Sequence, residues 1–263
     1  MHTAESLKQD LGHLGVDPSG ILLVHSSYKA IGETEGRGEA VLDSLIDYME
    51  TGLLLLPSHT WESVNSVNTE NPVMDVRTTP SCVGILPELF RKRPGVHRSL
   101  HPTHSVCGLG RYAVDFLAGD HLADTPCGFR TVYRRIYEQN GQILLIGVDF
   151  MSNTFIHGIE EWCGVPGILK EERTPLYVVD HDGNTHSTPM HCHTPSCCSS
   201  KAFESEEAMI AAGAVTRGKF GNADCLLCDA GKLSDELERM IKTGKICFPP
   251  SPSATARTPC NLS

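Results

Sequence analysis

Long apolar runs are missing from this chain of 263 residues, and so is any excess of positive charge. No apolar segment approaches the ~20 residues that a membrane-spanning helix needs, and the first residues lack the basic and apolar regions of a signal peptide. Asp and Glu outnumber Lys and Arg by 32 to 22, which gives a formal net charge of -10. The sequence therefore predicts a cytoplasmic protein that spans no membrane and binds neither nucleic acid nor an anionic membrane surface.

A phosphate-binding glycine loop is also absent. The cluster Gly32, Gly36 and Gly38 matches neither the Walker pattern nor the dinucleotide fingerprint. Any phosphorylated ligand must therefore be held by other donors. Two polar segments offer hydroxyl, guanidinium and ammonium groups for this purpose, one at residues 26–29 and one at residues 98–105.

Apolar periodicity predicts alternating helices and strands. Helices are expected at residues 4–14, 38–49, 84–93, 111–117, 131–139, 203–212 and 233–243, and strands at 21–25, 53–57, 142–146, 215–220 and 224–229. Segments 175–180 and 185–190 flank a turn and predict an antiparallel hairpin. We expect an α/β fold: a single three-layer α/β/α domain over residues 1–248, with a mixed, partly parallel central sheet and a hairpin in the second half. Residues 249–263 are expected to form a disordered tail.

One stretch, residues 141–161, organises the prediction of a site. Its first half is an apolar run bounded by glycines, typical of a buried strand, and its second half begins a helix near Ser152, Asn153 or Thr154. His157 then lies about one turn inside that helix, with Glu160 at position i+3. A helix that follows a parallel strand begins where open α/β sheets place their ligands, so the pattern predicts an imidazole–carboxylate pair in a site.

Four motifs, found in a fixed order, carry a family resemblance. They are Leu22-Leu23-Val24-His25-Ser26-Ser27, the segment 83–91, the segment 98–105, and residues 144–147 followed by Asn153-Thr154-x-x-His157-x-x-Glu160. Residues 211–230 are similar to a C-terminal signature of the same family. Together the motifs resemble the aminoglycoside 3-N-acetyltransferases, which use acetyl-CoA and are unrelated to the GNAT fold. The resemblance reaches to about Asp229.

The resemblance implies transfer of an acetyl group from acetyl-CoA to the 3-amino group of an aminoglycoside, in a ternary complex and without an acyl-enzyme. On the matching positions, His157 is the expected general base and Glu160 its orienting carboxylate. The expected acetyl-CoA contacts are Ser26, Ser27, Tyr28, Lys29, Arg98, Ser99, His101 and Ser105. The chemistry agrees, because an ammonium group must lose a proton before it attacks a thioester and imidazole accepts protons near neutral pH.

A polycationic amino sugar also needs acidic walls. The acidic residues expected to supply them are Glu62, Asp75, Asp149 and Glu161, and Asn153 is expected to bind substrate beside them. The expected partners are thus acetyl-CoA and a cationic amino sugar. The chain is expected to be a monomer or a homodimer.

The eleven cysteines leave other hypotheses open. The His191–Cys198 segment, together with Cys225 and Cys228, could close a zinc site, and the chain would then be a zinc-stabilised binding protein. Alternation along a strand would aim the last two cysteines at opposite faces, so no metal is expected. A cysteine-nucleophile acyltransferase or hydrolase, using Cys107 or Cys163, is a further alternative. Within the leading class, the acceptor could be an amine other than an aminoglycoside.

Overall fold

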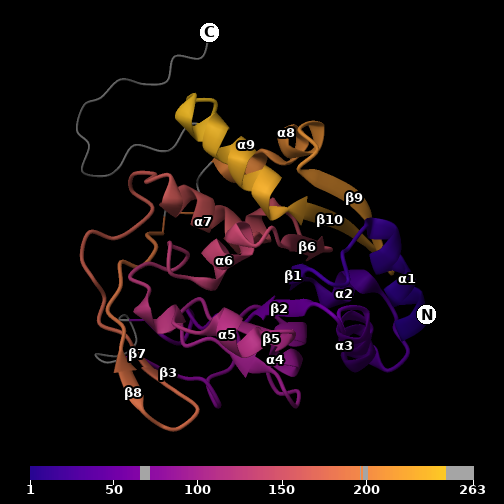
Figure 1. Cartoon of the computed structure of the whole chain (residues 1–263), viewed down its shortest axis with the longest axis horizontal. Helices are drawn as coiled ribbons and strands as arrows, with labels where there is room; N and C mark the ends of the chain where they lie inside the picture. The colour runs from indigo at the N-terminus through magenta and orange to yellow at the C-terminus, as the bar shows by residue number, and fades with distance from the viewer. Residues whose placement is uncertain (66–71, 196, 198–200, 247–263) are drawn as a thin grey trace.

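A seven-stranded mixed sheet forms the centre of the computed structural model, which describes residues 1–65, 72–195, 197 and 201–246 (Figure 1). The strand order is β4-β5-β2-β1-β6-β10-β9. The strands span Ile21–Ser26 (β1), Leu53–Pro57 (β2), His97–Arg98 (β4), Val106–Gly110 (β5), Gln142–Ile146 (β6), Val215–Phe220 (β9) and Ala223–Asp229 (β10).

The three central strands run parallel to one another, and each outer strand pairs antiparallel with its inner neighbour. Strand β1 pairs in parallel with β2, where Leu22 lies opposite Leu54, and with β6, where Val24 lies opposite Leu144. Strand β5 pairs antiparallel with β2, and β10 pairs antiparallel with β6. At the two edges of the sheet, β4 pairs antiparallel with β5, and β9 pairs antiparallel with β10. The predicted mixed, partly parallel sheet is confirmed.

Helices cover both faces of this sheet. Alternate side chains of β6 enter two separate cores: Ile143 and Leu145 pack against α5, α6, α7 and α9, while Leu144 and Ile146 pack with α1, α3 and α4. Burial on both faces explains why the central strands are continuous apolar runs. The predicted three-layer arrangement is confirmed. The helices span Ala4–Leu14 (α1), Tyr28–Ile31 (α2), Arg37–Tyr48 (α3), Ile85–Phe90 (α4), Ala113–Leu117 (α5), Val132–Glu138 (α6), Thr154–Trp162 (α7), Glu206–Ala211 (α8) and Ala230–Lys242 (α9), with 3-10 turns at Asp120–Leu122 (η1), Phe150–Ser152 (η2) and Lys201–Glu204 (η4).

A second, three-stranded sheet lies apart from the central one. It contains the predicted hairpin, Tyr177–Val179 (β7) and Thr185–Ser187 (β8), and a strand that the sequence did not predict, Val73–Asp75 (β3), parallel to β7. The hairpin turn is fixed by Asp180, whose Oδ1 accepts hydrogen bonds from the backbone N–H groups of Asp182 and Asn184. Met74 and Val178 belong to a small apolar core under this sheet.

The last described helix, α9, begins at Ala230, three residues before its predicted start, because the Asp229 side chain caps it by accepting from the Lys232 N–H. The predicted tail at residues 249–263 lies outside the described residues. Among the helices that are described, none is long and apolar enough to cross a membrane.

Candidate active site

Helix α7 places His157 beside the end of β6. Asn153 caps the helix, since its Oδ1 accepts a hydrogen bond of 3.3 Å from the Phe155 N–H. Phe155, Ile156 and Ile159 bury one face of the helix in the core. The remaining face carries His157, which is 8% exposed, toward the carboxyl end of the parallel strands.

His157 and Glu160 form the predicted pair. Nδ1 of His157 lies 3.2 Å from Oε2 of Glu160, one turn further along α7. Since an ionised carboxylate only accepts hydrogen bonds, Nδ1 carries the proton, and Nε2 holds the lone pair that can accept a proton. Glu160 is fully buried, and its Oε1 has no hydrogen-bond partner among the described residues. The carboxylate therefore fixes both the orientation and the tautomer of the imidazole.

A cavity of about 730 Å³ opens in front of this pair. Its lining combines loops that follow β1 and β2, the start of α7 and the segment around His193. Within the described part of the chain, no Asp or Glu side chain lines it, while Lys170 does. The cavity is large enough for a small ligand and mostly apolar, as such sites usually are.

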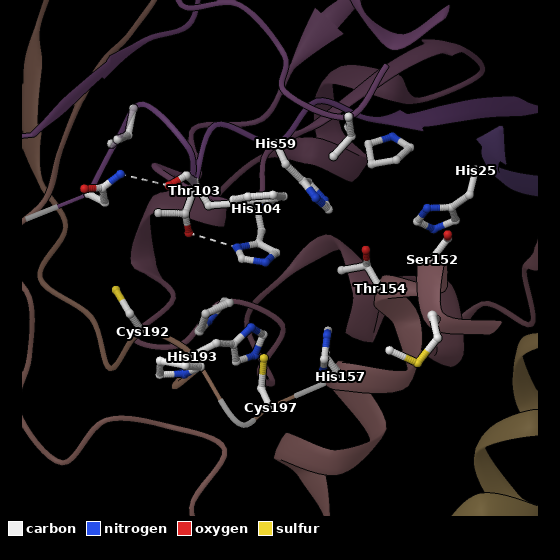
Figure 2. Close-up of a pocket in the computed structure, with 18 of the residues that line it drawn as sticks. His25, His59, Thr103, His104, Ser152, Thr154, His157, Cys192, His193 and Cys197 are labelled. Carbon is white, nitrogen blue, oxygen red and sulfur yellow. Dashed lines mark hydrogen bonds between the residues drawn. The ribbon is translucent and has the colours of Figure 1, made fainter. Parts of the chain in front are cut away.

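Histidines dominate the polar lining of this cavity (Figure 2). The ring of His193 lies between the rings of His157 and His104, with centroid separations of 4.7 Å and 5.3 Å, and His59 lies 4.7 Å from His104. Burial lowers the pKa of His59 and His104 well below the usual value, and it lowers the pKa of His25 to about 4. These three rings are therefore neutral at pH 7 and supply polar contacts without charge.

The segment at residues 26–29 divides between two cavities. Ser26 lines the main cavity, and its buried Oγ has no hydrogen-bond partner in the described ranges. Ser27 lines a second cavity of about 840 Å³. Tyr28 begins the short helix α2 and packs against the core under α1 and α3, whereas Lys29 is exposed. The structure thus places the two serines, but not the Tyr28 ring, at cavity walls.

The segment from Arg98 to Ser105 is turned into the protein. The Arg98 guanidinium donates to the carbonyls of Thr79 (2.6 Å) and Ser58 (2.7 Å) and to the Ser105 hydroxyl (3.0 Å). Burial lowers the pKa of Arg98, and these contacts hold the residue as a structural cross-brace. Its role as a contact to CoA phosphates stays a prediction.

The other predicted residues of that segment shape its turn. Nδ1 of His101 accepts hydrogen bonds from the backbone N–H groups of Thr103 and His104, so His101 holds the loop from behind while His104 faces the cavity. Ser99 accepts a hydrogen bond of 3.0 Å from the Val106 N–H and ties the loop to β5. These residues support the cavity wall, and direct contact with a ligand is shown for none of them.

The acidic residues predicted to line the substrate site lie in different places in the structure. The Glu161 side chain is buried, and its Oε1 accepts hydrogen bonds from the Cys127 N–H and from Nε2 of His193. Asp75, on β3, forms an ion pair with Arg77, which holds the pKa of Asp75 below its usual value. Glu62 is exposed and Asp149 is exposed at the second cavity, whereas Asn153 is fully buried as the cap of α7. Asp149 is therefore the predicted carboxylate that lines a cavity.

The second cavity adjoins the first, since Val148 and Ser152 line both. Three carboxylates line it, those of Asp149, Glu206 and Asp224. Two of them are compensated, because Glu206 pairs with Arg217 and Asp224 pairs with Lys219. Among the described residues that line the two cavities, Asp149 is thus the carboxylate without an ion pair.

The structure bears on both cysteine hypotheses, the zinc site and the cysteine nucleophile. Cys225 and Cys228 point to opposite faces of β10, in separate cores, so they cannot share one zinc ion as an adjacent pair. Burial raises the pKa of Cys107 to about 11 and also raises the pKa of Cys163. Neither thiol lines either of the two cavities, which leaves a cysteine nucleophile at these positions without support. Cys107, Cys163, Cys225 and Cys228 are free thiols.

Sequence reasoning missed four cavity histidines: His25, His59, His104 and His193. His25 and His104 belong to two of the motifs that carry the family resemblance, and both line the main cavity, but neither was named as a site residue. For His59, the one available signal was its position two residues after β2, at the carboxyl edge of a parallel strand. His193 approaches α7 from a loop 36 residues later, and no local pattern predicts that approach.

Comparison with known proteins places the chain in a family. The model of the aminoglycoside 3-N-acetyltransferase family matches residues 23–242. Aminoglycoside N(3)-acetyltransferase VII of Streptomyces paromomycinus is 28% identical over 261 residues, 89% of this chain and 89% of that protein. The YokD protein of Bacillus subtilis, an aminoglycoside N(3')-acetyltransferase-like protein, is 31% identical over 173 residues, 59% of this chain and 63% of YokD.

Solved structures agree on the fold. The crystal structure of YokD superposes with a TM-score of 0.80 at 26% identity, covering 93% of this chain and 94% of that one. The AAC-IIIb binary complex with CoASH superposes with a TM-score of 0.79 at 21% identity, covering 95% of this chain and 99% of that one. The family match over most of the sequence confirms the resemblance carried by the motifs and, with it, the prediction of an acetyltransferase: this chain belongs to the aminoglycoside 3-N-acetyltransferase family.

Proposed function

We propose that this protein transfers the acetyl group of acetyl-CoA to the 3-amino group of an aminoglycoside, directly within a ternary complex, with His157 as the general base. The observation that carries this proposal is the His157–Glu160 pair at a cavity of about 730 Å³, at the carboxyl edge of the parallel strands, in a chain of this family. The AAC-IIIb relative, whose structure contains CoASH, supports acetyl-CoA as the donor.

The proposed step begins with the acceptor amine in its ammonium form. Nε2 of His157 takes a proton from the nitrogen, the nitrogen attacks the thioester carbonyl carbon, and a new C–N bond forms. The C–S bond then breaks, the CoA sulfur leaves with the proton that the imidazolium returns, and the nitrogen loses its second proton to solvent as the amide forms. Buried Glu160 stabilises the imidazolium between these two events because it is an anion bonded to Nδ1.

The developing oxyanion needs donors, and the cavity wall supplies hydroxyl groups. Ser26 ends β1, Ser152 ends the 3-10 turn η2 and Thr154 begins α7, and all three line the same cavity as His157. Loss of one oxyanion donor costs about 2.7–4 kcal/mol in a well-studied protease. We infer that Ser26 is the foremost candidate, because its buried hydroxyl has no hydrogen-bond partner among the described residues.

Exposed charged side chains are the proposed contacts to the two substrates. Lys29 is exposed beside Ser26 and Ser27 and presents a cation to the CoA phosphates, while Arg98, Ser99, His101 and Ser105 hold the adjoining wall in place. On the acceptor side, Asp149 offers a carboxylate at the second cavity, which adjoins the first. Opposite charge at that position would bind the additional ammonium groups of an amino sugar.

One observation favours a second candidate, an acetyl-CoA-dependent N-acetyltransferase of an amine with fewer positive charges. Lys170 lines the main cavity, and the described residues of its lining include no carboxylate. A polycation would be repelled by Lys170 and would find negative charge only toward Asp149. The two candidates share donor, base and mechanism, and differ in the acceptor alone.

The test is release of CoA from acetyl-CoA, measured with a thiol reagent, with a panel of aminoglycosides and a matched panel of amines that carry a single charge. Release that depends on an aminoglycoside supports the first candidate, and release that depends only on the singly charged amines supports the second. No release with any amine, while acetyl-CoA binds, would contradict both.

A further inference from the structure

Two histidines, one buried and one half-buried, and a buried cysteine converge at the inner wall of the main cavity. His157 comes from α7, whereas His193 and Cys197 come from the segment that follows the second sheet (Figure 2). One nitrogen or sulfur atom from each of the three residues lies within 4.8 Å of the others. All three line the cavity, so an ion could reach them from solvent. This set differs from the one considered on sequence, which paired the His191–Cys198 segment with Cys225 and Cys228.

The chemistry of the three side chains suits zinc. Imidazole nitrogens and thiolates are both preferred zinc ligands, and three protein ligands are the number found in open zinc sites, in which a fourth position faces solvent or substrate. At zinc bond lengths of ~2.0–2.3 Å, tetrahedral ligands lie about 3.4–3.8 Å apart. Side-chain movements of about 1 Å would therefore close the observed set around an ion.

Each of the two imidazoles already has the hydrogen bond to a carboxylate that zinc-binding histidines usually have. Nδ1 of His157 bonds Glu160 at 3.2 Å, and Nε2 of His193 bonds Glu161 at 2.7 Å. A carboxylate on one ring nitrogen fixes the tautomer and directs the other nitrogen at the metal, which is the usual outer arrangement of metal-bound histidines. These two hydrogen bonds are an observation separate from the distances among His157, His193 and Cys197.

The charge balance points the same way. The side chains of Glu160 and Glu161 are 0% and 2% exposed, and their ion pairs within the described ranges are with histidines only. Glu160 Oε1 and Glu161 Oε2 are buried without a hydrogen-bond partner in the same ranges. Two buried carboxylates that each have an oxygen without a hydrogen-bond partner among the described residues favour an added cation close by.

A second trio competes for His193: Cys127, Glu161 and His193 also place ligand atoms within 4.8 Å of one another. Cys127 is fully buried, and neither Cys127 nor Glu161 lines the main cavity. A metal needs a path of entry, so this trio is the less accessible one. Use of Glu161 as a ligand would also remove the hydrogen bond that orients His193.

We infer that His157, His193 and Cys197 form a Zn²⁺ site whose occupation stops acetyl transfer. Binding forms two Zn–N bonds and one Zn–S bond and releases the thiol proton of Cys197 to solvent. The lone pair on Nε2 of His157 is then engaged by the metal and cannot accept the proton of the amine. The inhibitory consequence rests on the proposed role of His157, whereas the binding site does not.

The binding test uses the full chain, purified with a chelator and a reductant and then titrated with Zn²⁺ and with Co²⁺. We expect one Zn²⁺ per chain, release of one proton, and a thiolate-to-cobalt charge-transfer absorption. Cys197→Ser should abolish this absorption, and both Cys197→Ser and His193→Ala should weaken zinc binding at least ~100-fold. Glu161→Gln should weaken it ~10–100-fold. Cys82→Ser and Cys127→Ser are the matched controls, and each should bind zinc as the parent chain does.

Zinc affinity unchanged by Cys197→Ser would overturn the proposal, as would loss of binding in Cys127→Ser with Cys197→Ser unaffected. Thermal melting of each variant separates lost ligands from lost folding. The consequence is tested apart: Zn²⁺ should inhibit acetyl transfer at one equivalent, and a chelator should restore it. Full activity with one zinc bound would contradict the inhibition, whereas inactivity in the chelated protein would instead count against the proposed acetyl transfer.

Discussion

The negative charge of Glu160 decides how well His157 holds a proton during the proposed reaction. Its carboxylate is fully buried and hydrogen-bonded to Nδ1 of His157, so it acts on the reaction through the imidazole alone. Residues of this kind set the charge and tautomer of the base, and they leave the binding of either substrate largely unchanged.

Glu160→Gln keeps the shape of the side chain and removes its charge. We expect kcat to fall by about 10–100-fold, less than for loss of the base itself, with the KM for acetyl-CoA little changed. The acid limb of the kcat/KM profile should move to lower pH, because the imidazolium loses its anionic neighbour. A pH–rate series on the parent chain and the variant measures this, and an unmoved limb would remove Glu160 from its positioning role.

Arg98 illustrates a residue whose main effect should be on stability. Arg98→Ala removes the guanidinium donor from the part-buried Thr79 carbonyl, from the Ser105 hydroxyl and from the buried Ser58 carbonyl, which keeps the Ser105 hydroxyl as a donor, at a cost on the order of 3 kcal/mol. Urea unfolding measures this loss. The matched control is Arg77→Ala, which breaks an ion pair on an exposed side chain and should have a much smaller effect. Equal losses in the two variants would contradict the cross-brace.

At the scale of elements, the turn from β6 into α7 carries the site. Gly147 follows β6 with φ of 61°, and a Cβ atom at this position would lie 2.2 Å from the Cβ of Ala30. The strand thus turns away from the sheet only because the glycine permits both the positive φ and the close approach of α2.

Gly147→Ala should therefore lower stability by about 2–4 kcal/mol, the sum of left-handed strain and a steric clash. Gly183→Ala is the control, since its φ is 89° but nothing lies within 4 Å of the added Cβ, and only the backbone strain remains. Thermal or urea unfolding of both variants separates the two costs. A Gly183→Ala loss as large as that of Gly147→Ala would show that the contact with Ala30 is unimportant.

Local sequence patterns predict most of these elements but not their convergence. The buried runs of β1, β2 and β6 follow from periodicity, and the Glu160–His157 pair follows from helical spacing. Cap chemistry narrowed the start of α7 to three residues, of which the structure uses Asn153. Strand β3 was missed because three residues offer no period, and it is stabilised by pairing with β7 about a hundred residues later. His193 and Cys197 reach α7 by the same kind of long-range packing, which no local pattern encodes.

At the scale of the whole molecule, the buried histidines make stability depend on pH. Burial lowers the pKa of His25, His59, His101 and His104, and that of His25 to about 4. In the unfolded chain these rings titrate near pH 6.5, so the unfolded state binds more protons below that pH. The stabilisation is therefore fully present above pH 6.5 and is lost as pH falls toward the folded-state values.

We expect the free energy of unfolding to fall by several kcal/mol between pH 7.5 and pH 5, of which His25 alone contributes about 2 kcal/mol. Carboxylates with lowered pKa, such as Glu88, contribute mainly below about pH 4.5, outside this window. Urea unfolding across the range measures the slope. His25→Asn should flatten it, and His181→Gln, at an exposed position, should not. A slope of zero would contradict the burial of neutral histidines.

The central claim is that His157 is the base of a direct acetyl transfer, and the turnover of His157→Ala tests it most directly. The rate of CoA release with the best acceptor amine is measured alongside the Kd for acetyl-CoA, for the parent chain and the variant. We predict that kcat falls by ~10²–10⁴ while the Kd stays within a few-fold, because general-base catalysis contributes about that much and His157 is not needed to bind CoA. Near-normal turnover in the variant would contradict the account.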